Sequence, residues 1–284
     1  MKKIITVISF IILITVSCKK DNNKNINHGK IISLAPSLTK VIIDLKLIDN
    51  LVGVTEHCRH HDKMLQEMID NGKIKIVSGF NSFDYERILM LNPEKVLVMD
   101  SVSRESKDTL EKMIGLEKII SFRHPRNLDE INEQIIKVAS IFNVVDKGQT
   151  LINNSKKQLE LITKIDEDKK PTVLIEIYNS PYMAAGTNTF LADMVRIAGG
   201  KPAFEIKQDW ASISLEEVIS KDPDIIIKTH PTGTDLNLFK LIRAYRDNNI
   251  YIPIDVDSFL QPGFHTTSEI VKLNSYFTGF VNKS

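Results

Sequence analysis

The chain of 284 residues contains little cysteine, no long apolar run and almost no net charge. Its cysteines are Cys18 and Cys58, and its formal charge is +1. A basic stripe with interleaved aromatic residues is missing, so we expect no nucleic-acid partner. The apolar run at residues 4–16 is too short for a transmembrane helix. A glycine-rich phosphate loop, a nucleophile elbow and an HExxH zinc motif are also missing, so we do not expect an enzyme.

The N-terminus has the features of a secretory signal. Lys2 and Lys3 precede the apolar run, and the small residue Ser17 precedes Cys18. This arrangement resembles a bacterial lipoprotein signal, in which residues 1–17 are removed and Cys18 carries the lipid. Ordinary secretion with cleavage nearby is the alternative. Residues 18–29 are polar, as in a flexible tether. We therefore expect a lipid-anchored protein of the cell envelope without an intrachain disulfide, because only Cys58 then remains.

Residues 30–142 alternate short apolar runs with helical patterns. This alternation is typical of a parallel sheet with crossover helices, and it predicts an N-terminal α/β lobe. The expected strands are 30–34, 51–54, 73–77, 95–99 and 117–121, and the expected helices are 37–46, 85–91, 103–114 and 127–141.

A long helical pattern follows this lobe. Apolar and small residues recur at steps of three and four through residues 146–168, and no proline interrupts them before Pro171. A helix of this length would extend about 34 Å. We interpret residues 143–170 as one backbone helix that joins two lobes. An ordinary surface helix of a single domain is the alternative.

Residues 171–284 predict a second α/β lobe, with one segment that repeats an earlier one. The sequence DYERILMLNP at 84–93 matches SLEEVISKDP at 214–223, at an offset of 130 residues. Each copy predicts a helix cap, an acidic residue in the first turn, a proline and a following strand. Glu86 and Glu216 occupy equivalent places. The predicted fold class is therefore α/β, with two lobes of parallel sheets and flanking helices.

Three of the seven histidines fall in residues 56–62, EHCRHHD. This stretch lies between an expected strand and the next helix, where open α/β sheets place ligands. His57 and His60 are candidate metal ligands, because neutral imidazole binds Zn, Fe or Co. A solvated polar loop is one alternative. Another is a zinc hydrolase that uses His57–Asp62, although no carboxylate stands at a recognisable general-base spacing.

Taken together, both halves resemble the cobalamin- and iron-chelate-binding proteins of ABC importers, and most of all the periplasmic vitamin B12-binding proteins. Two lobes joined by one backbone helix define this class. Besides the expected inter-lobe helix, the resemblance rests on KIISLAPSLTKVIIDLKLIDNLVGVTEHC, FDYERILMLNPEKVLVM, YMAAGTNTFLADMVRIAGGKPAF, WASISLEEVISKDPDIII and IDVDSFLQPGFH. These stretches extend over nearly all of residues 30–275.

The resemblance implies roles for individual residues. Transporter-docking carboxylates of the family fall on Glu86 and Glu216. The residues that correspond to its ligand contacts in the inter-lobe cleft are His57, Phe80, Tyr182, Trp210, Asp257 and His265. Two positions depart from the family, since imidazoles replace tyrosine at His57 and arginine at His265. A pocket bordered by imidazoles favours a metal centre over an anionic siderophore.

The resemblance thus implies a binding protein with no cofactor of its own. We expect it to capture a metal-bearing macrocycle or chelate, with cobalamin first, haem second and ferric chelates third. Its partners would be a two-fold ABC permease and, through the lipid, a membrane, and we expect it to act as a monomer. A surface scavenger or sensor without its own permease is the alternative.

Overall fold

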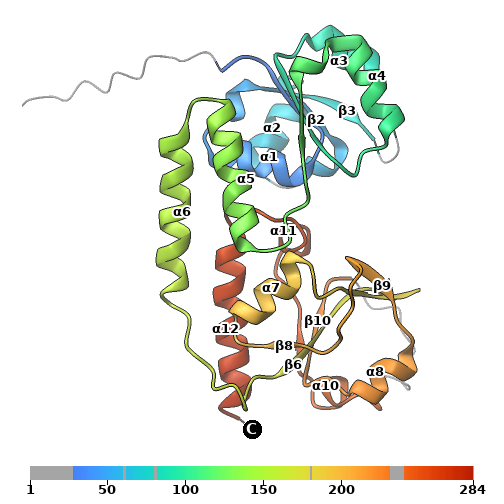
Figure 1. Cartoon of the computed structure of the whole chain (residues 1–284), viewed down its shortest axis with the longest axis vertical. Helices are drawn as coiled ribbons and strands as arrows, with labels where there is room; N and C mark the ends of the chain where they lie inside the picture. Colours follow the sequence, from blue (N-terminus) through green and yellow to red (C-terminus); the bar gives the residue numbers. More distant parts are fainter. Residues whose placement is uncertain (1–27, 60–61, 80–81, 180, 231–239, 284) are drawn as a thin grey trace, which may run out of the picture.

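The computed structural model describes residues 28–59, 62–79, 82–179, 181–230 and 240–283. Cys18, most of the predicted tether and the site candidates His60 and Phe80 lie outside these ranges. Two lobes follow one another along the long axis, and α5 (Leu128–Ile141), α6 (Val145–Leu159) and α12 (Thr266–Val281) run along one edge (Figure 1). Among the described helices, none is long and apolar enough to cross a membrane.

The N-terminal lobe contains a parallel sheet with the strand order β3-β2-β1-β4-β5. Each predicted strand forms, within two residues of its expected start. The strands are β1 (Ile31–Ser33), β2 (Leu51–Thr55), β3 (Lys75–Ser78), β4 (Lys95–Met99) and β5 (Ile119–Phe122). The helices, besides α5, are α1 (Pro36–Asp44), α2 (Lys63–Asp70), α3 (Tyr85–Leu91) and α4 (Arg104–Ile114), with 3₁₀ turns at Ile48–Asn50, Glu56–Cys58 and Leu116–Lys118.

The C-terminal lobe has a mixed sheet with the order β11-β10-β6-β7-β9, and β8 also pairs with β6. The prediction of a parallel sheet was therefore wrong for this lobe. Only residues 180 and 181 separate β6 from β7, and so short a connection forces antiparallel pairing. The strands are β6 (Thr172–Asn179), β7 (Tyr182–Ala185), β8 (Lys201–Pro202), β9 (Trp210–Ser212), β10 (Ile225–Lys228) and β11 (Ile250–Tyr251). The helices, besides α12, are α7 (Phe190–Ile197), α8 (Leu215–Lys221), α10 (Arg243–Arg246) and α11 (Val256–Phe259).

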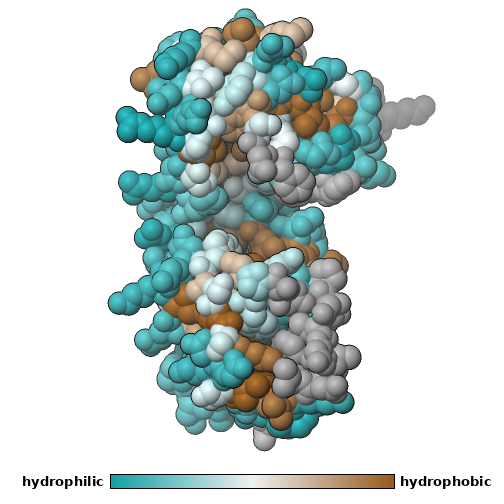
Figure 2. Space-filling view, turned by 90° about the vertical axis from the view of Figure 1, so that its right-hand side faces the viewer, coloured by the Kyte–Doolittle hydropathy of each residue, from teal (hydrophilic) through white to brown (hydrophobic). Residues whose placement is uncertain are grey.

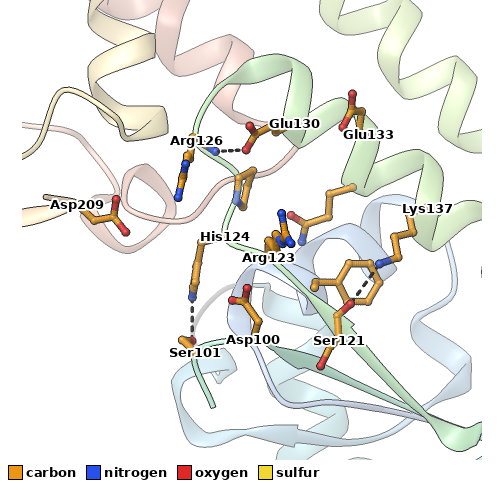
Figure 3. Close-up of a pocket in the computed structure, with 13 residues that line it drawn as sticks. Asp100, Ser101, Ser121, Arg123, His124, Arg126, Glu130, Glu133, Lys137 and Asp209 are labelled. Carbon is orange, nitrogen blue, oxygen red and sulfur yellow. Dashed lines mark hydrogen bonds between the residues drawn. The ribbon is translucent and has the colours of Figure 1, made fainter. Parts of the chain in front are cut away.

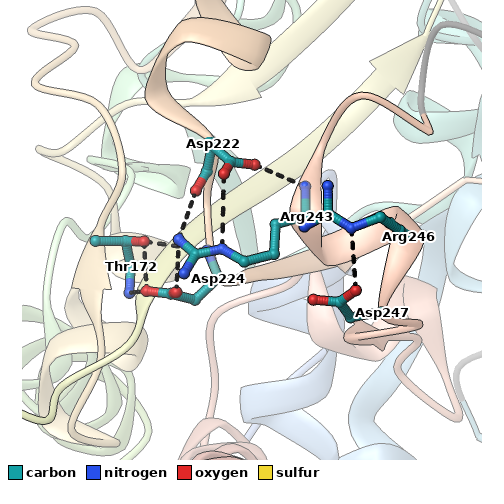
Figure 4. Close-up of polar contacts among 6 residues, drawn as sticks. All are labelled: Thr172, Asp222, Asp224, Arg243, Arg246 and Asp247. Atoms are coloured by element: carbon teal, nitrogen blue, oxygen red, sulfur yellow. Dashed lines mark hydrogen bonds and ion pairs between the residues drawn. The ribbon is translucent and has the colours of Figure 1, made fainter. Parts of the chain in front are cut away.

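The amino ends of β6 and β10 are tied together on the side away from the N-terminal lobe (Figure 4). Asp224 Oδ2 accepts hydrogen bonds from the backbone N–H and the hydroxyl of Thr172, at 2.8 and 2.7 Å. Arg243 Nη2 lies 2.9 Å from Asp224 Oδ1. These contacts fix the register of the two central strands, so their carboxyl ends finish together on the side that faces the other lobe.

The connection between the lobes is helical over only part of its predicted length. Helix α6 ends at Leu159, and the chain continues without helix to Pro171. The side chain of Asn274 in α12 accepts from the backbone N–H of Thr163 and donates to its carbonyl, each at 2.8 Å. These bonds replace the ones that a further helical turn would make. The prediction of one backbone helix over residues 143–170 was therefore wrong beyond Leu159.

A continuous apolar core runs through both lobes. It includes buried residues of β1, β4 and α5 on one side and of β6, β10, α7 and α12 on the other. Two smaller clusters cover the outer faces of the two sheets. Helices α5 and α6 approach closely at Gly148, where an added Cβ would lie 2.9 Å from Ala139 Cβ. The lobes thus share one core along the edge formed by α5, α6 and α12.

Candidate functional site between the lobes

A pocket of about 900 Å³ lies between the lobes, at the carboxyl ends of β4 and β5 (Figure 3). Asp209 enters it from the C-terminal lobe, and its other lining residues belong to the N-terminal lobe and α5. Ligands of open α/β folds bind outside the carboxyl ends of parallel strands, as this pocket does. It is lined by Asp100, Ser101, Ser121, Phe122, Arg123, His124, Pro125, Arg126, Glu130, Glu133, Gln134, Lys137 and Asp209.

The segment between β5 and α5 contributes three basic side chains to the pocket. Arg123, His124 and Arg126 follow the buried last residue of β5. His124 Nε2 lies 3.0 Å from Ser101 Oγ, and the backbone N–H of Arg126 donates to Glu130 Oε2 over 2.8 Å (Figure 3). Within the described ranges, neither arginine side chain forms an ion pair. Both guanidinium groups can therefore donate hydrogen bonds to a ligand.

The pocket lining carries charges of both signs. Its cations are Arg123, Arg126 and Lys137, and its carboxylates are Asp100, Glu130, Glu133 and Asp209. Lys137 Nζ donates to the carbonyl of Ser121 at 3.2 Å and lies 4.5 Å from the centre of the Phe122 ring. The amide nitrogen of Gln134 is buried without a hydrogen-bond partner in the described part of the chain. The pocket offers donors and acceptors in similar number, and it suits a ligand edge with mixed polar groups better than a polyanion.

The C-terminal lobe has a buried charged cluster at the carboxyl ends of β6 and β10. Glu176 has no exposed surface, and its Oε2 accepts hydrogen bonds from Tyr182 at 2.6 Å and Tyr245 at 2.8 Å. Its Oε1 contacts His230 Nε2 and lies 3.9 Å from Lys228 Nζ. Burial, and then the charge of Glu176, raises the pKa of both tyrosines, so they remain hydrogen-bond donors. Because a buried carboxylate is costly without partners, this cluster fixes the geometry of the lobe where it faces the cleft.

Two predicted aromatic contacts differ in their surroundings. Trp210, at the start of β9, is 44% exposed and directly follows Asp209 of the pocket. Tyr182 is half-buried, and its hydroxyl is bound to Glu176. Trp210 is therefore exposed next to a residue of the pocket, whereas the hydroxyl of Tyr182 is bound in the interior of the lobe.

The predicted histidine cluster is partly used for structure. His57 is exposed in the 3₁₀ turn after β2, at the carboxyl end of that strand. Asp62 caps α2 by accepting from the backbone N–H of Leu65 at 2.9 Å, and Arg59 bridges Glu56 and Asp70. In the described part of the chain, no group of three or more His, Cys, Asp or Glu residues is placed to hold a metal. His60, the second predicted metal ligand, lies outside that part.

The remaining predicted ligand residues lie around α11. Asp257 is exposed on this helix, and the half-buried His265 follows it. His265 Nε2 lies 2.7 Å from the carbonyl oxygen of Ser258, whose hydroxyl accepts from Lys40 Nζ of the N-terminal lobe at 2.6 Å. Burial, and then the positive charge of Lys40, lowers the pKa of His265 to about 4. His265 thus supports a contact between the lobes.

The internal repeat has the same local structure in both lobes. Asp84 caps α3 by accepting from the N–H of Arg87, and Ser214 forms a capping box with Glu217 at the start of α8. In both helices the C-cap residue, which directly precedes a proline, has a left-handed backbone conformation, with φ of 46° at Asn92 and 42° at Asp222. Glu86 and Glu216 are exposed in the first turns of α3 and α8, which lie toward opposite ends of the molecule (Figure 1).

Several residues of the site were missed from the sequence. Arg123, His124 and Arg126 belong to the run RHPR at 123–126, which begins two residues after the end of the predicted strand 117–121, and that position could have marked them. Glu176 and Lys228 interrupt the apolar strand sequences VLIEIYN and DIIIKTH, which is the usual sign of a buried charge that requires partners.

Comparisons with known proteins show the family of the chain. A family model described as "Periplasmic binding protein" matches residues 31–246. The chain is 25% identical over 207 residues to a Bacillus subtilis (strain 168) protein called an uncharacterized ABC transporter substrate-binding lipoprotein, YvrC. That match covers 70% of this chain and 63% of the relative. A vitamin B12-binding protein of Vibrio parahaemolyticus is 21% identical over 260 residues, which cover 89% of this chain and 91% of the relative.

Solved structures show the same fold. The periplasmic heme-binding protein BhuT in complex with two hemes has a TM-score of 0.73 at 17% identity. That likeness covers 89% of this chain and 99% of that chain.

Proposed function

The chain belongs to the periplasmic binding protein family, and from this premise we propose that it is the lipid-anchored substrate-binding component of an ABC importer. Its ligand would be cobalamin or a related metal-bearing macrocycle, with haem second and ferric chelates third. The principal support is the pocket between the lobes, in which Asp209 faces Arg126 and His124 from the opposite lobe (Figure 3).

The charges of both signs that line the pocket are the reason for ranking cobalamin before haem and ferric chelates. A corrin carries mostly amide groups on its periphery, and amides both donate and accept hydrogen bonds. Haem and many ferric chelates present carboxylates or other anionic oxygens, which would meet the carboxylates of the lining at short range. A neutral amide periphery therefore fits the pocket better than an anionic one.

Titration of the purified protein with cyanocobalamin, haemin and a ferric chelate, each followed by absorption, tests the ligand. We expect saturable binding of cyanocobalamin with the highest affinity. Binding of the ferric chelate alone would contradict the proposed ligand class. If none of the three ligands bound, the proposed role in the import of metal-bearing macrocycles or chelates would be contradicted.

Delivery to a permease is the second part of the proposal. Glu86 and Glu216 would each meet a basic residue of a two-fold permease, and two contacts on one rigid body reinforce each other. Reversal of both charges to lysine should abolish ligand uptake by cells, whereas either single reversal should reduce it. Ligand titration of the purified double variant is the control and should be unchanged. Normal uptake by the double variant would favour a surface scavenger or sensor.

The anchor is the third part. Substitution of Cys18 by alanine should release the protein from membranes or leave its precursor unprocessed. Mass spectrometry of the mature protein should find a lipid on Cys18, and an unmodified N-terminus elsewhere would contradict the anchor.

A further inference from the structure

We propose that the outer end of the N-terminal lobe rests directly on an anionic lipid membrane when the protein is anchored. The contact is made by Leu89 and Met90 of α3 and Leu116 of the turn after α4, three side chains that we call the apolar edge, and by lysines beside them. This inference rests on the proposed lipid at Cys18, and it adds a non-covalent contact with the same membrane.

The apolar edge is open to solvent. Met90 is 85% exposed, Leu116 64% and Leu89 49%. Helix α3 packs on the lobe through the buried Ile88, and its exposed face carries Glu86, Leu89 and Met90, which lie three and four residues apart. Figure 2 views the molecule from the side of α3 and α8, and hydrophobic residues lie between hydrophilic ones over the upper lobe. A surface helix normally turns polar residues to solvent, so this face of α3 suits a partner.

The internal repeat shows that folding does not require this apolar face. Helix α8 has the same kind of cap and the same left-handed C-cap as α3, at an offset of 130 residues. There the equivalent of Leu89 is Ile219, which is half-buried against the outer apolar cluster of its lobe. The equivalent of Met90 is Ser220, which is exposed. The repeated unit thus folds with a small polar residue at the position of Met90.

The chain enters the N-terminal lobe beside the apolar edge. Lys30 Nζ donates to the carbonyl of Leu91, the last residue of α3, over 3.3 Å. Lys118, two residues after Leu116, donates to the side chain of Asn92 over 3.5 Å. These contacts bring the start of the described chain, the end of α3 and the turn after α4 to one place. Figure 1 shows α3 and α4 at the end of the molecule away from the C-terminal lobe.

The proposed anchor holds this end of the molecule near the lipid. His28, where the described chain begins, is ten positions after Cys18. A chain of ten residues reaches at most about 36 Å even when it is fully extended. The C-terminal lobe lies beyond the whole N-terminal lobe (Figure 1). The end that carries the apolar edge is therefore the part of the fold that the anchor keeps closest to the membrane.

Lysines accompany the apolar edge and continue into the predicted tether. Lys30 and Lys118 stand at the end of α3, and Lys112 is exposed in the last turn of α4. Glu94 and Glu117 are exposed among them, so the lobe contributes a small positive excess. The tether adds Lys19, Lys20 and Lys24 against Asp21. Apolar side chains beside lysines are typical of surfaces that bind anionic lipids.

The size of the apolar edge favours a membrane over a second copy of the chain. A stable dimer buries about 800 Å² on each partner, whereas three side chains expose only on the order of a few hundred Å². Apolar side chains enter the headgroup region without a complementary groove. Glu86 stands one helical turn before Met90 on the same face. A lobe that rests on the membrane at Met90 would therefore present Glu86 to a permease in that membrane.

Vesicle co-sedimentation tests the contact in the absence of the lipid. The mature chain, residues 18–284, with Cys18→Ala should sediment with vesicles of phosphatidylcholine and phosphatidylglycerol, and salt should weaken this binding. It should not sediment with phosphatidylcholine alone. Met90→Glu in this chain should lower the bound fraction at least about fivefold, because it removes an apolar group and adds a charge of the lipid's sign. The matched control, Ser220→Glu at the equivalent position of α8, should bind like the parent.

Further variants decide which groups make the contact. Leu116→Glu should have an effect similar to that of Met90→Glu, and circular dichroism checks the fold of both. Full binding by both variants would assign the attraction to the lysines alone and overturn the apolar edge. A dimer in sedimentation equilibrium that is lost in Met90→Glu would assign the surface to a second copy and overturn the membrane contact.

Mass spectrometry of Cys18 separates this inference from the proposed anchor. If Cys18 carries a lipid and the lipid-free chain does not bind anionic vesicles, the membrane contact is wrong and the anchor stands. If Cys18 carries no lipid, the anchor is wrong and the inference that rests on it is wrong too. A lipid on Cys18, together with vesicle binding that Met90→Glu weakens and Ser220→Glu does not, supports both.

Discussion

The two lobes stabilise the strand ends that face the cleft in different ways. In the N-terminal lobe, the buried polar groups there are hydroxyls and a thiol. Thr39 Oγ1 donates to Ser33 Oγ at 2.8 Å, and Cys58 Sγ lies within 3.3 Å of the hydroxyls of Thr39 and Thr55. In the C-terminal lobe, the corresponding strand ends bury charged groups, Glu176 and Lys228.

This difference has an energetic consequence. A neutral hydrogen bond contributes about 1 kcal/mol, and a buried neutral group left without its partner costs about 1–3 kcal/mol. A buried ion costs several kcal/mol to desolvate, so its partners cannot be removed singly without a large penalty. We therefore expect the loss of a buried polar group to destabilise the C-terminal lobe more than the N-terminal lobe, and substitutions at five positions test this comparison.

The largest effect is expected at Glu176. Glu176→Ala leaves Lys228 buried without its carboxylate and should lower the free energy of unfolding by about 3–5 kcal/mol. Urea denaturation measures this change. Glu176→Gln is the control, because it keeps an acceptor for the two tyrosine hydroxyls, and its loss should be smaller. If Glu176→Ala lowered the free energy of unfolding by less than about 1 kcal/mol, the proposed energetic difference between the lobes would be wrong.

The second effect concerns Asp44, at the end of α1. Burial raises the pKa of Asp44 from 3.8 to about 6. Since its folded pKa lies above its unfolded pKa, its contribution to stability is complete below pH 3.8 and is lost as pH rises through about 6. Asp44→Asn should therefore stabilise the protein at pH 8 by about 2–3 kcal/mol and have no effect below pH 3.8.

His265 gives this prediction a second readout. Its pKa is lowered from 6.5 to about 4, so stability is lost as pH falls through that interval. In the wild type the two slopes oppose each other between pH 4 and pH 6. In thermal melts over this interval, Asp44→Asn should lose stability more steeply than the wild type as pH falls, because the opposing contribution of Asp44 is gone. If the stability of Asp44→Asn depended on pH in the same way as that of the wild type, the raised pKa of Asp44 would be contradicted.

A smaller effect is expected at Thr39. Thr39→Val keeps the shape of the side chain and removes its hydrogen bonds, so the loss should be about 1 kcal/mol. Urea denaturation beside Glu176→Ala makes the comparison direct. Equal losses in the free energy of unfolding for Thr39→Val and Glu176→Ala would contradict the idea that buried charge makes the C-terminal lobe more sensitive to substitution.

The smallest effect is expected at the repeated helices. Glu86→Lys and Glu216→Lys each replace a favourable charge in a first turn, which changes stability by about 0.3–1 kcal/mol. The change should be the same in both lobes. Thermal melts that differ strongly between these variants would mean that the repeat is not equivalent in the folded protein.

Local signals predicted most of the elements, and long-range contacts determined where prediction failed. The caps Asp84 and Ser214 act on the helices directly after them, so the local sequence predicts them. The end of α6 depends on Asn274, which is 111 residues from Thr163. No window of local sequence contains that contact.

The candidate site shows the same limit. The resemblance predicts Trp210 and Glu216 as site residues because it includes their surroundings. The orientation of Tyr178 depends on a register shift against β7, and the partners of Glu176 come from three separate segments. Such features arise only when the strands pair, so no local stretch of sequence predicts them.

The hydrogen bonds between Asn274 and Thr163 also bear on the order in which the protein is made. Domains fold as units and the N-terminal part emerges first during synthesis. The parallel sheet of the first lobe is complete long before residue 274 leaves the ribosome. The connection to the second lobe is held by α12, which follows every other described helix along the chain. We therefore expect a nascent chain that does not yet include α12 to contain a folded first lobe whose orientation relative to the second lobe is not yet fixed.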